Sequence, residues 1–134
     1  MELTARIINR TGDWYRVWSL QDSSKKSYGR MSYNGYRGMY KVEIFIPVHE
    51  ELGNIACSEF NVRAVALTWA REIIEDLPEP EVANYEAAIR KVKDFRYQDE
   101  MSDDFAYSNG KIARWDRIER ELKDRMHSLT QGAI

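Results

Sequence analysis

A series of carboxylates is the first group of side chains whose types and spacing suit a chemical role. Acidic residues outnumber basic ones by eleven to four between positions 72 and 104. A negative surface of this kind can meet the basic groove of a nucleic-acid-binding protein and speed its association, although the solvated faces of two helices have the same composition. The carboxylates in or beside expected turns are the candidate partner contacts: Glu79, Glu81, Asp99, Glu100, Asp103 and Asp104.

Aromatic rings interleaved with cations form the second group, near the N-terminus. Positions 1–46 hold eight basic and four acidic residues. Sheets with such side chains bind single-stranded nucleic acid, because bases stack on the rings while cations follow the phosphates. Tyr and Arg are also frequent anchors of protein interfaces, and in a strand half of the rings face a core. The alternative binding face consists of Arg16, Arg30, Tyr33, Tyr36 and Arg37.

Side chains for catalysis or metal binding are few. His49 and Cys57 are close in sequence, as a thiol–imidazole pair requires, but a Cys in an apolar segment before a helix is typical of a small core residue. Two histidines and one cysteine without a local ligand cluster do not indicate zinc. No P-loop, dinucleotide-binding or nucleophile-elbow motif occurs. We therefore expect no catalytic residue, no cofactor, no metal ion and no enzymatic activity.

The elements that position these groups begin with strands. Lys41 and Glu43 alternate with apolar residues, which places both on the face of a strand that points away from the core. Asn34-Gly35 is the dipeptide that most favours a two-residue type I′ hairpin turn. Alternation and turn residues predict strands over 2–9, 14–20, 27–33, 38–48 and 55–60.

Helices follow the strands. A helix over 58–77 is indicated by apolar residues at helical spacing, with Ser58 or Asn61 as its N-cap. Its apolar face is expected to consist of Val62, Val65, Ala66, Trp69 and Ile73. Two further helices are predicted over 81–96 and 111–129, separated by a polar connector at 98–104 and a break at 108–110.

This order of elements predicts an α+β fold, with an N-terminal antiparallel sheet of three to five strands followed by three helices packed on it. The length of 134 residues fits a single domain over 1–134, mainly strands over 1–60 and mainly helices over 61–130. No apolar segment approaches the roughly 20 residues of a membrane span, and the N-terminus has no signal-peptide core. Together with the lone cysteine, these features lead us to expect a soluble, cytoplasmic protein.

The path from residue 38 to residue 77 is strand, turn, strand and helix, with a hairpin before it. This layout resembles the three-strand-plus-helix topology of AP2-like and integrase arm-binding DNA domains. The resemblance implies a nucleic-acid-binding module that uses the sheet, and it implies no site residues because no motif matches residue by residue. A pI of about 5.8 counts against a DNA-binding protein.

The sequence therefore favours a non-enzymatic interaction protein that binds and occludes a protein partner. Small phage-encoded inhibitors of host defence systems, including anti-CRISPR proteins, have this character, and the acidic series would act as a nucleic-acid mimic. The expected partner is a protein, or a nucleic-acid-binding complex, in the cytoplasm of a host cell. The alternative is the nucleic-acid-binding module, with its contacts on the aromatic and basic sheet. Neither hypothesis involves a membrane.

Overall fold

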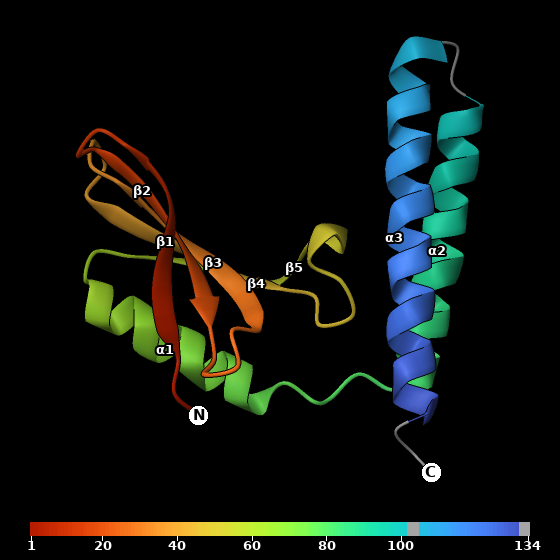
Figure 1. Ribbon diagram of the computed structural model, residues 1–134. Coiled ribbons are helices and arrows are strands. Elements are labelled where there is room, and N and C mark those ends of the chain that lie inside the picture. The colour runs from red at the N-terminus through yellow and green to blue at the C-terminus, as the bar shows by residue number, and fades with distance from the viewer. Residues whose placement is uncertain (102–104, 132–134) are drawn as a thin grey trace. The chain divides into compact units, whose positions relative to one another are not determined.

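The computed structural model describes residues 1–101 and 105–131. These residues form two compact units, Met1–Pro78 and Glu79–Ile134. The first unit contains a five-stranded antiparallel sheet and one helix, and the second contains two helices (Figure 1). The predicted α+β class is confirmed, while the folding of the whole chain as one domain stays a prediction.

The sheet of the first unit is a simple meander in which every strand pairs antiparallel with the next one in the chain. This arrangement needs only short hairpin connections. A short 3₁₀ helix, η1, spans Glu50–Leu52 between the last two strands. The strands are β1 (Thr4–Thr11), β2 (Tyr15–Gln21), β3 (Ser27–Asn34), β4 (Met39–Phe45) and β5 (Asn54–Phe60).

One face of this sheet packs against α1, Arg63–Asp76. Strand alternation sends every second side chain to this face, and the helix contributes Ala66, Ala70 and Ile74 at intervals of four residues. The small alanines allow the helix backbone to approach the strands closely. The buried cluster that results is Trp18, Leu20, Met31, Val42, Ile44, Ala66, Ala70 and Ile74.

The helical face expected for α1 is correct at Ala66 and in part at Trp69 and Ile73, and wrong at its first two residues. Val62 is the N-cap residue, and Val62 and Val65 are about half exposed, at 49% and 52%. Trp69 and Ile73 are only partly buried, at the edge of the core. The centre of the buried face runs along Ala66, Ala70 and Ile74, so Trp69 and Ile73 lie beside it and not at its centre.

The start of α1 differs from the expectation for a related reason. Ser58 belongs to β5 and pairs with Val42, so it is not available as a cap. Helical structure begins at Arg63, and no side chain caps the N-terminus. The strand ends at Phe60, as expected, and the helix begins five residues after its expected start at position 58.

The hairpin between β3 and β4 is also longer than expected. Its loop has four residues, 35–38, and the N–H of Gly38 donates to the Asn34 carbonyl over 2.8 Å. A type I′ turn needs positive φ at both central residues, but only Gly38 has it, at 64°. Gly35 is required for another reason, because a Cβ there would lie 3.0 Å from the Trp14 Cα.

The second unit is a helical hairpin of α2, Val82–Glu100, and α3, Phe105–Gln131, which run side by side in opposite directions (Figure 1). Both are longer than predicted, so residues 98–100 are helical and the expected break at 108–110 lies inside α3. The buried seam consists of Tyr85, Ala88, Ile89, Val92, Ile118 and Leu122. Among the described residues, no helix combines the length and apolarity that a membrane crossing requires.

Candidate binding surface on the sheet

The face of the sheet opposite α1 is the candidate functional surface. No helix within residues 1–78 covers it, so we call it the open face. The strand register places on it the residues that alternate with the core, such as Lys41 beside its β5 partner Glu59, and Glu43 beside Cys57. Lys41, Glu43 and Glu59 are charged, as expected for the solvated face of an antiparallel sheet, while Val17 and Met39 are apolar members of the same face.

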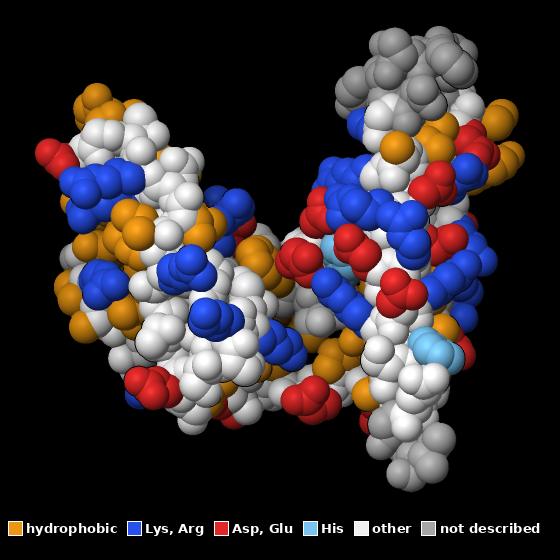
Figure 2. All heavy atoms as spheres, in the orientation of Figure 1, with side chains coloured by type: hydrophobic (Ala, Val, Ile, Leu, Met, Phe, Trp, Pro, Cys, Tyr) orange, Lys and Arg blue, Asp and Glu red, His pale blue; other side chains and the backbone are white. Residues whose placement is uncertain are grey.

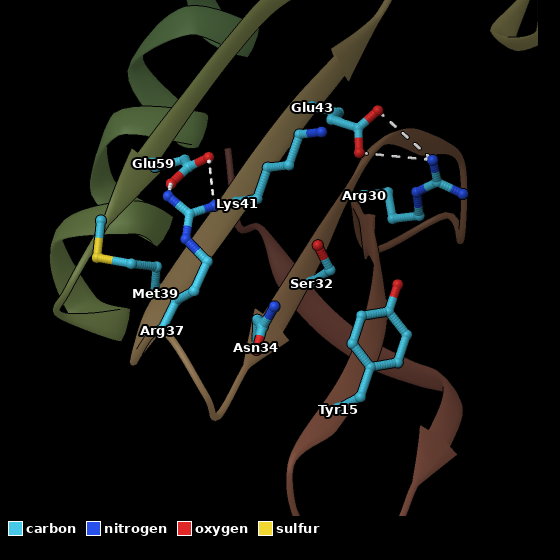
Figure 3. Close-up of a pocket in the computed structure, with 9 residues that line it drawn as sticks. All are labelled: Tyr15, Arg30, Ser32, Asn34, Arg37, Met39, Lys41, Glu43 and Glu59. Atoms are coloured by element: carbon cyan, nitrogen blue, oxygen red, sulfur yellow. Dashed lines mark hydrogen bonds and ion pairs between the residues drawn. The ribbon is translucent and has the colours of Figure 1, made fainter.

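A shallow hollow of about 370 Å³ lies on the open face. Its volume is at the lower end of the range typical of ligand sites. The lining side chains come from four strands and from the β3–β4 loop, and they combine both signs of charge with neutral polar groups (Figure 3). They are Tyr15, Arg30, Ser32, Asn34, Arg37, Met39, Lys41, Glu43 and Glu59.

Arg37 forms the first ion pair of the hollow. Its Nη2 lies 2.9 Å from Glu59 Oε2 and its Nη1 lies 3.3 Å from Glu59 Oε1. This two-pronged geometry is the one that an Arg guanidinium favours with a carboxylate. Lys41 faces Glu59 in the strand register, but the carboxylate is already held by Arg37 from the loop.

Glu43 is held in a similar way on the other side. Arg30 Nη2 lies 3.4 Å from Glu43 Oε2, and the Asn54 side chain donates to the same oxygen over 2.8 Å. Lys41 lies between this group and the Arg37–Glu59 pair (Figure 3). Among the described residues, its ammonium makes no hydrogen bond or ion pair. The hollow therefore contains one cation that is available to a ligand.

Neutral polar groups complete the lining. Tyr15 and Ser32 each bring a hydroxyl group, and Asn34 brings an amide. The Asn34 Oδ1 accepts a hydrogen bond from the Tyr36 backbone N–H over 3.0 Å. Its amide nitrogen has no acceptor among the described residues and remains a donor toward the hollow.

Two exposed aromatic rings stand beside the hollow, at the end of the sheet where the β1–β2 and β3–β4 loops meet. The rings of Trp14 and Tyr36 are 5.1 Å apart between centroids, and their side chains are 44% and 82% exposed. We call this pair the aromatic tip. The Gly35 N–H donates to the Trp14 carbonyl, which fixes the two loops to each other. Tyr15 connects the tip to the hollow, because its ring centroid lies 5.7 Å from that of Trp14.

The structure divides the predicted basic and aromatic set. Arg30 and Arg37 lie together in the hollow, and Tyr36 lies at the aromatic tip. Arg16 and Tyr33 point to the other face of the sheet, where the Arg16 guanidinium lies 5.3 Å from the centre of the Tyr33 ring. Arg16 Nε is enclosed and has no hydrogen-bond partner among the described residues. These two side chains belong to the edge of the core, so the five residues do not form one surface.

Sequence reasoning did not assign Lys41, Glu43, Glu59 or Trp14 to the binding surface. Lys41 and Glu43 had been placed on the polar face of their strand, but nothing in the sequence showed that Arg37 would take Glu59. Trp14 was counted among the aromatic residues, although its proximity to Tyr36 depends on the pairing of two loops. The alternation of polar and apolar residues along β4 was the one sequence signal that indicated Lys41 and Glu43 as exposed residues of this face.

The predicted acidic contacts are partly used inside the second unit. Asp99 Oδ2 accepts a hydrogen bond from Trp115 Nε1 over 2.6 Å, and Glu100 forms an ion pair with Arg96. Glu81 is the N-cap of α2 and shares a capping box with Asn84. Figure 2 shows acidic and basic side chains interleaved along these helices, while basic side chains are spread over the sheet unit. A strongly negative face is therefore not evident in this view.

The remaining acidic candidates differ in what the structure says of them. Glu79 is exposed and lies just before the second helix, where it is accessible to a partner. Asp103 and Asp104 lie outside the described residues. The assignment of partner contacts to this set therefore stays a prediction.

The cysteine is not the core residue that was expected. Cys57 is exposed, because its position in β5 places it on the open face opposite Glu43. In the same strand, Ala56 and Phe60 pack against the core, whereas Ile55, two residues before the cysteine, is exposed. His49 has a separate local role, since its Nδ1 accepts the Glu51 N–H at the start of η1.

Comparison with known proteins adds no further assignment. No family model, no curated protein and no solved structure matches this chain.

Proposed function

We propose that this chain is a non-enzymatic binding protein that occludes a protein partner, and that it makes the contact with the open face and the aromatic tip. The observation that carries this proposal is an exposed Trp14–Tyr36 pair held in place beside a charged hollow. Trp, Tyr and Arg are the residue types that dominate binding energy in protein interfaces. The surface supplies all three.

Preorganisation of these side chains favours tight binding. The loop that carries Tyr36 is tied by the Asn34 side chain, and the loop that carries Trp14 is tied by Gly35. Binding then orders fewer groups, and the entropy lost on association is smaller. Two large rings at a fixed spacing can also bury substantial apolar area against a partner.

The acidic surface is the weaker candidate for this contact. Asp99 and Glu100 are engaged in side-chain contacts within their own unit, so a partner would compete with Trp115 and Arg96 for them. Inhibition of a host defence complex, as by a phage-encoded anti-CRISPR protein acting in the host cytoplasm, remains within the proposal. In that case occlusion by the sheet, and not nucleic-acid mimicry by the helices, is the expected mode.

A second candidate function is direct binding of single-stranded nucleic acid by the same surface. The observation that favours it is the combination of the free Lys41 ammonium with the stacking platform of Trp14 and Tyr36. Two observations disfavour it. Glu43 and Glu59 lie in the hollow, and residues 1–78 hold ten basic and ten acidic side chains, so the unit lacks the positive excess that phosphate contacts require.

The experiment that tests the proposal compares the wild-type chain with Tyr36→Ala and Trp14→Ala as bait in a lysate of a candidate host. Recovery of one protein in stoichiometric amount by the wild type, and a weakening of more than about 2 kcal/mol in each variant, is the expected result. Glu79→Ala serves as the matched control and should bind as the wild type does. If both aromatic variants kept the partner and Glu79→Ala lost it, the proposal would be contradicted. The acidic residues, and not the open face, would then make the contact.

Mixed single-stranded DNA and RNA provide the test of the second candidate. The second candidate is favoured if the affinity falls steeply with the logarithm of salt concentration and if Tyr36→Ala abolishes the binding. The ligand of the open face would then be nucleic acid and not a protein.

A further inference from the structure

We propose that the hollow receives a single carboxylate from an acidic segment of a protein partner, and that Lys41 is the cation that binds it. This inference rests on the proposed function and names the chemistry of the partner. It follows from the way in which the other charges of the hollow are already paired.

The hollow contains one more positive side chain than negative side chains. The lining contains three cations and two carboxylates. Arg37 holds both oxygens of Glu59, while Glu43 is held by Arg30 and by the Asn54 amide. Among the described residues Lys41 alone of the three cations has no partner, which leaves a net single charge for a ligand to neutralise.

The neighbours of Lys41 determine which anion fits. Glu43 lies near the end of the Lys41 side chain, and Glu59 lies on the other side of that side chain (Figure 3), so a chain with a negative charge on every unit would place further charges against them. Negative charges of a ligand that lie close to these carboxylates are repelled by them. One carboxylate among uncharged residues meets Lys41 without that repulsion. The hollow is therefore suited to an Asp or Glu side chain and poorly suited to a phosphate backbone.

The neutral groups of the hollow match the needs of a carboxylate. A carboxylate accepts hydrogen bonds at about four lone-pair sites, and the Lys41 ammonium can supply only part of them from one direction. The Ser32 and Tyr15 hydroxyls and the Asn34 amide line the same hollow and are the available donors. A charge-assisted bond to Lys41 is the strongest of these contacts.

The aromatic tip indicates what accompanies the acid. Tyr15 lines the hollow, and its ring is next to Trp14, which in turn contacts Tyr36. The polar hollow and the apolar rings are thus one continuous surface. A segment that places its carboxylate at Lys41 has an aromatic or large apolar residue nearby in its sequence, packed on Trp14 and Tyr36.

The test uses fluorescein-labelled peptides and the full chain, with binding measured by fluorescence anisotropy. One peptide carries a single Glu flanked by Gly-Tyr units, its control carries Gln in place of that Glu, and a labelled oligothymidine represents nucleic acid. The Glu peptide should bind at least about tenfold more tightly than the Gln peptide, which corresponds to the loss of one charge-assisted contact. Equal binding of the two peptides, or no binding of the Glu peptide, overturns the inference.

Two variants of the chain assign the effect to the hollow. Lys41→Gln should weaken the Glu peptide by about tenfold or more, whereas Lys93→Gln, the same charge change on the exposed face of α2, should leave it unchanged. Glu59→Gln frees Arg37 and should tighten the Glu peptide several-fold, because the hollow then has two free cations. An unchanged affinity in Lys41→Gln, or tighter Lys41-dependent binding of oligothymidine than of the Glu peptide, also overturns the inference.

The same variants separate this inference from the proposed function. If Tyr36→Ala lost the protein partner and Lys41→Gln kept it at full affinity, the proposed function would be supported. The inference that the hollow binds a carboxylate would be contradicted. A Glu peptide that binds through Lys41 in a chain whose protein contact survives Tyr36→Ala and Trp14→Ala would support the carboxylate site and reject the proposed binding surface.

Discussion

Single residues of the open face decide which cation is available. Glu59 faces Lys41 in the register, and a Lys–Glu pair across two strands would be the simple expectation. The Arg37 guanidinium, reaching in from the β3–β4 loop, takes that carboxylate with two hydrogen bonds instead. Exposed pairs of this kind contribute only about 0–1 kcal/mol to stability. Their consequence here is the free ammonium of Lys41.

Glycine positions offer a sharp test of the backbone geometry. A Cβ added at Gly29 would lie 2.3 Å from the Glu43 carbonyl oxygen, so β3 and β4 could not keep their pairing. We expect Gly29→Ala to lower the free energy of unfolding by about 1–3 kcal/mol, the usual cost of forced overpacking. Urea denaturation followed by circular dichroism measures this change.

Gly110 is the matched control for that substitution. It lies within α3, and an added Cβ would have no neighbour within 4 Å. Gly110→Ala should therefore stabilise the protein, by about 0.5–1 kcal/mol, because Ala is the better helix former. If Gly29→Ala were as harmless as Gly110→Ala, the close pairing of β3 with β4 would be incorrect.

Asp22 organises the β2–β3 loop through its carboxylate. Its Oδ1 accepts hydrogen bonds from the Ser24 hydroxyl over 2.6 Å and from the Lys26 N–H over 3.1 Å, and its Oδ2 accepts one from the Tyr28 hydroxyl. The bond from Ser24 is the largest cause that holds the pKa of Asp22 below its ordinary value, and Tyr28 and Lys26 add to it.

This lowered pKa predicts the pH dependence of stability. Because the folded chain binds the proton less readily than the unfolded chain, Asp22 contributes stability above its ordinary pKa of about 3.9, and that contribution is lost as the pH falls through the folded value. The wild type should thus exceed Asp22→Asn in melting temperature near neutral pH, and the difference should shrink below about pH 4. A difference that stayed constant or grew in acid would contradict the role given to the carboxylate.

At the scale of elements, the strands were more predictable than the helices. Each strand end lies within three residues of its expected position, because alternation and the turn residues both act locally. The helix seam of α1 depends on how closely Ala66 and Ala70 approach the sheet, which no local pattern records. The end of α2 depends on partners in α3, such as the stacking of Phe95 on Trp115 at 5.1 Å.

The contact between α2 and α3 changes the expected effect of the acidic substitutions. Asp99 is not a neutral surface position, because its carboxylate accepts the Trp115 indole N–H in a partly buried position. Asp99→Lys should therefore lower the free energy of unfolding by about 1 kcal/mol, since a partly buried donor loses its acceptor. Glu79→Lys is the control, because Glu79 is exposed outside the helices, and it should have an effect within about 0.5 kcal/mol. Equal melting curves for the two variants would show that the Asp99–Trp115 bond carries no stability.

At the scale of the whole molecule, the sequence predicted the class of fold and only part of the candidate surface. The order of strands and helices is enough for α+β, and the polarity of Lys41 and Glu43 is enough to predict an exposed face. The assembly of the hollow is different, because it joins side chains from four strands and a loop. Arg37 and Glu59 are 22 positions apart in the chain, and their pairing follows from the register of three strands together.

The most direct test of the central claim uses the single cysteine of the chain. Cys57 is exposed on the open face beside Glu43, so a partner that covers this face must protect it. The measurement is the rate of Cys57 alkylation by a maleimide, with and without a saturating amount of the captured partner. A control chain with Cys57→Ala and Lys93→Cys places the thiol on the exposed face of α2. We predict that the partner slows alkylation of Cys57 by about tenfold or more and leaves the control thiol unaffected. Equal rates at Cys57 with and without the partner would contradict the account, because the open face would then not be where the partner binds.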